Sequence, residues 1–279
     1  MSRRQHAGQA MWGLGDQALS SLTNFALSIV VARNVSVGEF GAFTLAFATY
    51  TVLLTICRAL TSEPLVMRYS LAGRADWRSA TAVATGVSLT VGVTSGVVLV
   101  ATGALVDDSI GLSLIVLGIA LPGLLVQDAW RYAFFTAGRG RSALVNDLVW
   151  AIVLFALLVP AARAGLTVTS TLVIWALGAT AAAMFGIVQA RTLPDITRPM
   201  HWWRLHRDLI PKLSAEAVVL SGAQPLTLFA VGGVAGIAAV GTLRAAQVLM
   251  NALNIVTQGI RLSAVPAATR VVRRSPGAL

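Results

Sequence analysis

Residues 110–134 read IGLSLIVLGIALPGLLVQDAWRYAF, and this stretch decides the class of fold. Residues 110–126 carry no charged side chain, and the whole segment as a helix is long enough to cross a hydrocarbon core of about 30 Å. A strand of a membrane barrel would instead alternate polar and apolar residues over about ten positions. The stretch therefore predicts a transmembrane helix with Gln127, Asp128 and Arg131 near one end.

Apolar windows of this kind recur along the 279 residues, of which only 11% are charged, against roughly a quarter in soluble domains. The mean hydropathy of +0.77 is likewise higher than expected of a soluble domain. The sequence predicts an all-α, polytopic membrane helix bundle with about 8 transmembrane helices. We place the spans at 10–32, 39–62, 81–104, 110–134, 143–162, 168–190, 213–234 and 240–262.

Motifs of soluble enzymes are absent from the chain. The single cysteine, Cys57, excludes an intramolecular disulfide and a cysteine metal cluster. The three histidines are scattered, and His201 and His206 are five residues apart, which is not the i, i+4 spacing of a helical metal site. We therefore expect no enzyme, no catalytic residue, no metal and no cofactor.

The net charge of +10 is distributed over the loops in a regular way. Basic residues are frequent in every second loop and rare in the loops between, which is the pattern of cytoplasmic loops in membrane proteins. It predicts a multi-pass protein of the cell (inner or plasma) membrane with both termini cytoplasmic, and it argues against nucleic-acid binding. The predicted inner segments carry Arg3, Arg4, Arg68, Arg74, Arg78, Arg139, Arg141, Arg191, Arg198, Arg204, Arg207, Lys212, Arg270, Arg273 and Arg274, and the outer ones Arg33, Arg163 and Arg244.

Polar residues line single faces of several predicted spans. Ionisable groups are costly inside a membrane and usually face a cavity or one another. These faces therefore predict a hydrophilic cavity in the bundle. They comprise Asp16, Ser20, Asn24 and Ser28 on the first span, Thr51, Thr55, Arg58 and Ser62, followed by Glu63, on the second, and Asn251, Asn254, Gln258 and Arg261 on the eighth.

The charged members of these faces lie at similar depths near the cytoplasmic side. Asp16 and Arg58 are expected at the inner ends of their spans, and Asp128 and Arg131 approach the same level, with spacings that allow local pairing along their own helix. We interpret them as a charged vestibule. In the alternative, the two arginines extend to inner lipid phosphates and Asp16 caps the start of a helix. The candidate substrate-binding residues are Arg58, Arg131, Asn24, Gln127 and Gln258, and the candidate ion-coupling residues are Asp16, Asp128 and Glu63.

An internal repeat is visible at an offset of 200 residues. Asp16 then aligns with Glu216, and Gly41 with Gly241. The copies are separated by an even number of spans, so both have the same orientation in the membrane. Between them, residues 200–212 mix tryptophans with cations, which fits either an interfacial amphipathic helix or an ordinary connector with aromatic anchors.

Several segments resemble bacterial polysaccharide flippases of the O-antigen and teichoic acid type, in the multidrug/oligosaccharidyl-lipid/polysaccharide exporter superfamily. These are residues 15–25 (GDQALSSLTNF), 31–34 (VARN), 39–43 (EFGAF), 58–64 (RALTSEP), 127–135 (QDAWRYAFF) and 146–150 (NDLVW). The resemblance implies two six-helix lobes around a central cavity. It also implies movement of lipid-linked sugars across the membrane by alternating access.

Compared with that pattern, the chain looks truncated. We expect a first six-helix lobe at 1–192, a cytoplasmic amphipathic connector at 193–212, and the first two helices of an incomplete second lobe with a basic tail at 213–279. The expected partners are a lipid-linked sugar, membrane lipids and a second chain that completes the second lobe. The alternative functions are a drug or metabolite antiporter of the same superfamily and a non-transporting scaffold for cell-envelope biosynthesis.

The loop charges yield a testable topology. Reporter fusions after Arg78, Arg141 and Lys212 should be active in the cytoplasm, whereas fusions after Asp108 and Gly165 should report the outer side. Paired alkaline phosphatase and green fluorescent protein fusions measure this directly. A cytoplasmic fusion at Asp108 would contradict the span assignment.

Overall fold

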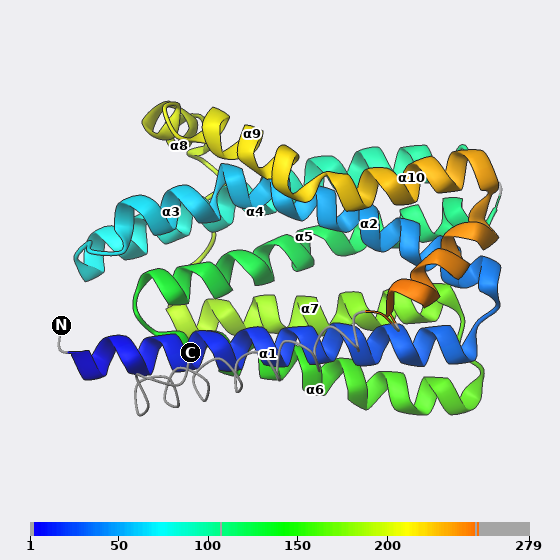
Figure 1. The fold of residues 1–279 in the computed structure, drawn as a ribbon. Helices are drawn as coiled ribbons and strands as arrows, with labels where there is room; N and C mark the ends of the chain where they lie inside the picture. Colours follow the sequence, from blue (N-terminus) through cyan, green and yellow to red (C-terminus); the bar gives the residue numbers. More distant parts are fainter. Residues whose placement is uncertain (1–2, 107, 249, 251–279) are drawn as a thin grey trace, which may run out of the picture.

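The computed structural model describes residues 3–106, 108–248 and 250, and these residues form a bundle of helices with no strand among them (Figure 1). Consecutive long helices run in opposite directions and are joined by short loops. The helices are α1 (Arg3–Asn34), α2 (Val37–Leu60), α3 (Ser62–Tyr69), α4 (Arg74–Gly103), α5 (Ser109–Thr136), α6 (Gly140–Ala164), α7 (Val168–Ala190), α8 (Pro199–His206), α9 (Ile210–Ser221) and α10 (Ala223–Ala235), followed by a helix over Ile237–Val248.

Five helical segments are long and apolar enough to cross a membrane, or six if the bent pair α9–α10 counts as one span. The five are Val37–Tyr69, α4, α5, α6 and α7. The predicted membrane bundle is therefore supported, but the predicted count of about eight is not confirmed. Helix α1 is long, yet its polar face keeps it outside this set, and the eighth predicted span continues from Ile237–Val248 into residues outside the described ones.

The outward faces of the long helices are apolar, as lipid contact requires. Large apolar side chains such as Val97 on α4, Ile119 on α5, Ile152 on α6 and Met184 on α7 are more than half exposed. A soluble protein rarely exposes a contiguous apolar surface of this extent. These faces therefore fit a protein whose solvent is the hydrocarbon of a membrane.

Three helices start at the same end of the bundle, and each is capped by a side chain. Ser36 and Glu39 form a capping box at the start of α2, and Thr167 and Ser170 form another at the start of α7. Asp108 accepts hydrogen bonds from the first backbone N–H groups of α5. Such caps satisfy orphan donors and fix where each helix begins.

Helices α4 and α5 form the closest pair, because glycines face glycines along their contact. Gly96 and Gly118 lie against each other's backbone, and Gly103 and Gly111 repeat this arrangement nearer the connecting loop. Small residues permit such approach in lipid, where apolarity alone drives no association between helices. We call these four residues the glycine seam.

The basic residues of the loops gather at the end of the bundle where α1 begins. This end, which we call the arginine end, holds the loops between α3 and α4 and between α5 and α6, and the chain after α7 (Figure 1). Arg33 and Arg163 lie at the opposite end. The structure thus separates the charges between two ends, and the cytoplasmic placement of the arginine end stays a prediction.

The predicted connector contains a short helix, α8, that is anchored to α3 and the end of α2. The Trp202 indole is buried, lies over Tyr69 and donates a hydrogen bond to the carbonyl oxygen of Leu60 at 2.9 Å. Arg68 pairs with Asp208 at 2.7 Å. Trp203, by contrast, is exposed. The connector is therefore partly helical and packs through Trp202 on α2 and α3, and its position at the membrane interface stays a prediction.

The offset of 200 residues corresponds to a reciprocal contact in the structure. Helix α2 begins at Val37, and the later helix begins at Ile237. A Cβ on Gly41 would clash with the carbonyl oxygen of Ile237, and a Cβ on Gly241 would clash with that of Val37. Residues that correspond in the repeat thus exchange the same contact, as they do across a two-fold axis. The division into lobes stays a prediction.

The glycine seam predicts opposite effects for two identical substitutions. A Cβ on Gly118 would lie 2.6 Å from the carbonyl oxygen of Gly96, whereas a Cβ on Gly233 meets nothing within 4 Å. Gly118→Ala should destabilise the protein by about 1–3 kcal/mol through overpacking. Gly233→Ala should be neutral or stabilising by up to about 1 kcal/mol, because alanine favours a helix. Thermal unfolding in detergent measures both, and equal effects of the two substitutions would contradict the seam.

Candidate functional site

Near the arginine end, α2 and α5 are joined by a bidentate ion pair. The Arg58 guanidinium donates from Nε to Asp128 Oδ2 at 2.8 Å and from a terminal nitrogen to Asp128 Oδ1 at 2.5 Å. Asp128 is buried, Arg58 is partly buried, and its guanidinium lies 5.2 Å from the centre of the Tyr132 ring. Two parallel bonds from one guanidinium fix the orientation of both groups.

A second ion pair joins α5 to α1 and α6. Arg131 Nε lies 2.5 Å from Asp16 Oδ2 and 3.5 Å from Asp147 Oδ2. Gln127, one turn before Arg131, donates to Asp147 Oδ1 at 2.8 Å. Asp16 and Asp147 are almost fully buried, so the guanidinium replaces the water that these carboxylates lose.

The five ionisable groups Asp16, Arg58, Asp128, Arg131 and Asp147, which we call the ion cluster, do not balance in charge. Three carboxylates face two guanidiniums, which leaves one negative charge when all five are ionised. One bound proton makes the cluster neutral. Oδ1 of Asp16 is buried and has no hydrogen-bond partner among the described residues, so it is an available position for that proton.

The ion cluster borders two hollows. One, of about 530 Å³, is lined by Asp16, Ser20 and Asn24 of α1 together with Arg58 and Arg131. The other, of about 350 Å³, lies between α2, α3, α5 and α9, and its lining includes Glu63 and Glu216. Arg58, Val66 and Tyr132 line both hollows and so form the wall between them. A change in the pairing of Arg58 would therefore alter both spaces.

The structure brings most of the predicted site residues to this place. Asp16, Arg58, Gln127, Asp128 and Arg131 form or touch the ion cluster. The remaining three predicted residues differ: Asn24 lines the first hollow, Glu63 lines the second, and Gln258 lies outside the described residues.

One detail of the sequence interpretation is wrong. Asp128 and Arg131 were expected to allow pairing within their own helix, but each pairs with a residue of another helix. The reason is geometric: the carboxylates of α1 and α6 approach Arg131, and Arg58 of α2 approaches Asp128. Asp16 lies well inside α1 and bonds Arg131, so it does not cap the helix start.

Sequence reasoning missed Asp147 and Asn146. Asp147 contributes the third carboxylate, and Asn146 donates to the carbonyl oxygen of Ala182 at 2.9 Å and to Gln189 Oε1 at 3.1 Å. The signal was present, because Asp147 is an ionisable residue inside a predicted span. Asp147 lies about 10 Å along α6 from its start, and Asp128 lies about 12 Å along α5 from its end, so the two have similar depths.

Comparison with known proteins yields no relative of this chain. No protein-family model, curated protein or solved structure matches it. The functional argument therefore depends on the geometry of the ion cluster and the hollows beside it, together with the resemblance of short segments noted in the sequence.

The ion pair between Arg58 and Asp128 predicts a non-additive result in a double-mutant cycle. Arg58→Ala alone leaves a buried carboxylate without its partner and should cost about 3–5 kcal/mol. The double variant Arg58→Ala, Asp128→Ala removes both charges and should be less destabilised than the sum of the two single variants. Unfolding in detergent at neutral pH measures the coupling energy. Additive losses would show that the two groups do not act as a pair.

Proposed function

We propose that this chain is the cavity-forming part of a membrane transporter that moves a lipid-linked oligosaccharide or polysaccharide precursor from the inner to the outer leaflet. The observation that carries the proposal is the ion cluster, which borders hollows on two sides within a bundle of apolar helices. Buried charges are costly inside a membrane bundle, and those that are present usually belong to a functional site. The resemblance of residues 127–135 and of the N-terminal segments to polysaccharide flippases supports the same class.

In this proposal, Arg58 and Arg131 receive the anionic diphosphate of the substrate. Each guanidinium is now held by carboxylates, at 2.5 Å from Asp128 and from Asp16 respectively. A phosphate group of the diphosphate presents two oxygens that a guanidinium can contact together, as a carboxylate does, so it can take the place of the aspartate. Binding of the substrate then exchanges a carboxylate for a phosphate, so that each guanidinium keeps an anionic partner.

Because the ion cluster has one carboxylate more than it has guanidiniums, protonation of a carboxylate can drive the exchange of aspartate for substrate. When Asp16 gains a proton, its attraction for the neighbouring guanidinium falls, and the arginine becomes available to the substrate. Release of the proton restores the ion pair and displaces the diphosphate. The cluster in this proposal couples one proton to one cycle of substrate binding and release.

One observation favours the second candidate, an antiporter for a drug or metabolite. The carboxylates outnumber the guanidiniums, and Glu63 and Glu216 line the second hollow, so the site has a surplus of negative charge. A cationic substrate could use that surplus in exchange for protons. No such observation favours the non-transporting scaffold. The main proposal also includes assembly with a second chain.

Transport should fail when the two arginines are removed. In cells that depend on this protein, we expect Arg58→Ala and Arg131→Ala each to lower the flux of lipid-linked sugar roughly tenfold or more, since each loses a charge-assisted bidentate contact. Lysine at either position should restore only part of the flux, because it lacks the planar fork. Flux is measured as precursor on the outer leaflet, normalised to the amount of protein in the membrane.

The matched control is Arg68→Ala, which breaks an exposed pair with Asp208 and lines neither hollow, so it should leave flux per molecule unchanged. Asp16→Asn makes the cluster neutral without a proton and should remove the dependence of flux on pH. Normal flux in the double variant Arg58→Ala, Arg131→Ala would overturn the proposal. Loss of cation efflux with normal sugar flux would favour the antiporter instead.

A further inference from the structure

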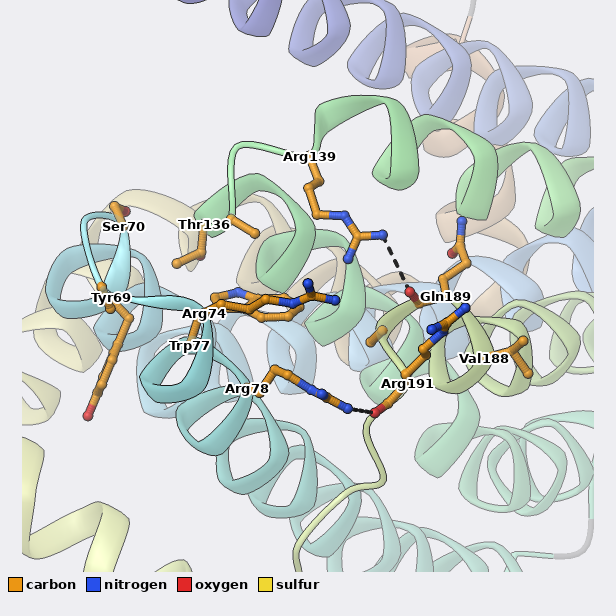
Figure 2. A pocket seen from close by; sticks show the side chains of 13 residues that line it. Tyr69, Ser70, Arg74, Trp77, Arg78, Thr136, Arg139, Val188, Gln189 and Arg191 are labelled. Carbon is orange, nitrogen blue, oxygen red and sulfur yellow. Dashed lines mark hydrogen bonds between the residues drawn. The ribbon is translucent and has the colours of Figure 1, made fainter. Parts of the chain in front are cut away.

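A separate cavity of about 830 Å³ opens at the arginine end of the bundle (Figure 2). It lies between the start of α4, the loop that joins α5 to α6, and the end of α7. Four arginines line it: Arg74 and Arg78 from α4, Arg139 from the loop, and Arg191 from the end of α7. We call this space the arginine pocket. The sequence interpretation counted these residues only as topology signals.

The arginine pocket has no compensating carboxylate. No aspartate or glutamate lines it, and the ion pairs of the described residues involve other arginines. Asp76 of α4 lines a different, smaller hollow. Four positive charges that share one cavity repel one another, and an anion that enters it relieves this repulsion.

Two of the arginines are held in place by the end of α7. Arg78 donates to the carbonyl oxygen of Arg191, and Arg139 donates to the carbonyl oxygen of Gln189 at 3.4 Å (Figure 2). Arg139 also lies 5.5 Å from the centre of the Phe134 ring. These contacts orient the two side chains and leave further guanidinium N–H groups for a ligand, since each guanidinium has five donors.

The other two arginines are available. The side chains of Arg74 and Arg191 make no hydrogen bond or ion pair within the described part of the chain, yet both line the cavity. Both helices that begin at this cavity, α4 and α6, lack a side-chain cap, unlike α2, α5 and α7 at the far end. Their first N–H groups therefore add to the positive potential that the arginines create.

We propose that the arginine pocket binds a phosphate group, carried either by an anionic phospholipid of the adjacent leaflet or by a soluble phosphate compound. Planar guanidiniums match phosphate oxygens in pairs, and the cavity has room for the group that carries the phosphate. Its place at one end of the apolar helices is the level at which lipid headgroups lie. The proposal does not depend on the transported substrate.

The test compares two variants of equal charge. Arg74→Gln, Arg191→Gln removes the two available arginines and spares Arg78 and Arg139, which hold the end of α7. The control Arg141→Gln, Arg207→Gln removes two exposed arginines of the same end that do not line the pocket. The proteins are purified in a neutral detergent, and the shift in unfolding temperature is titrated with phosphatidylglycerol, with phosphatidylcholine and, separately, with sodium phosphate against sodium chloride at equal ionic strength.

We expect phosphatidylglycerol or phosphate to stabilise the wild type and the control, and to act about tenfold more weakly on the pocket variant. A response to phosphatidylglycerol alone identifies a lipid as the source, and a response to sodium phosphate identifies a soluble compound. An equal loss in the control would show nonspecific attraction and overturn the proposal. An unchanged response in the pocket variant, or no response of the wild type to either phosphate source, would overturn it as well.

Discussion

A guanidinium in the interior of a membrane bundle needs a carboxylate partner, because the surrounding medium offers no water to solvate it. A buried carboxylate likewise needs a cation, and helix α5 carries one group of each kind, Asp128 and Arg131. The requirement is met from three sides, by Arg58 of α2, Asp16 of α1 and Asp147 of α6. The relative positions of four helices therefore depend on these ionic contacts.

The packing of the remaining helices follows from the same solvent. Since hydrocarbon surrounds the bundle, burial of apolar side chains drives helix association only weakly, and close backbone contact has to replace it. Gly96 and Gly118 allow that contact between α4 and α5, and Gly41 and Gly241 allow it between the two helices that the internal repeat relates. Polar contacts thus orient the helices around the hollows, whereas glycines allow close helix packing elsewhere in the bundle.

Sequence reasoning could predict the features that depend on local pattern. Apolar length placed α2, α5, α6 and α7 within about three residues of their bounds, whereas α4 begins seven residues before its predicted span and α3 was not predicted. The rule that charges inside spans meet one another selected Asp16, Arg58, Asp128 and Arg131. It could not assign partners, because pairing depends on how the helices are rotated about their axes. Asp147 was missed because no polar residues at helical spacing form a stripe with it along α6. Gln258 and the lobe division lie beyond what the described residues test.

The arginines of the ion cluster and those of the arginine pocket differ in whether a carboxylate balances their charge, which residue type alone does not predict. Arg58 and Arg131 lie deep in the bundle and are balanced by carboxylates, so any anion that binds them must displace an existing partner. Arg74 and Arg191 lie at its end and have no carboxylate beside them, so an anion can bind them without displacing anything. The first arrangement suits a site that has to switch between partners, and the second suits a site that stays occupied.

Gln189 of α7 lies between the two groups of arginines. Its side chain accepts a hydrogen bond from Asn146, the neighbour of Asp147, while its backbone carbonyl accepts one from Arg139. One residue of α7 thus contacts both an arginine of the arginine pocket and the asparagine beside Asp147.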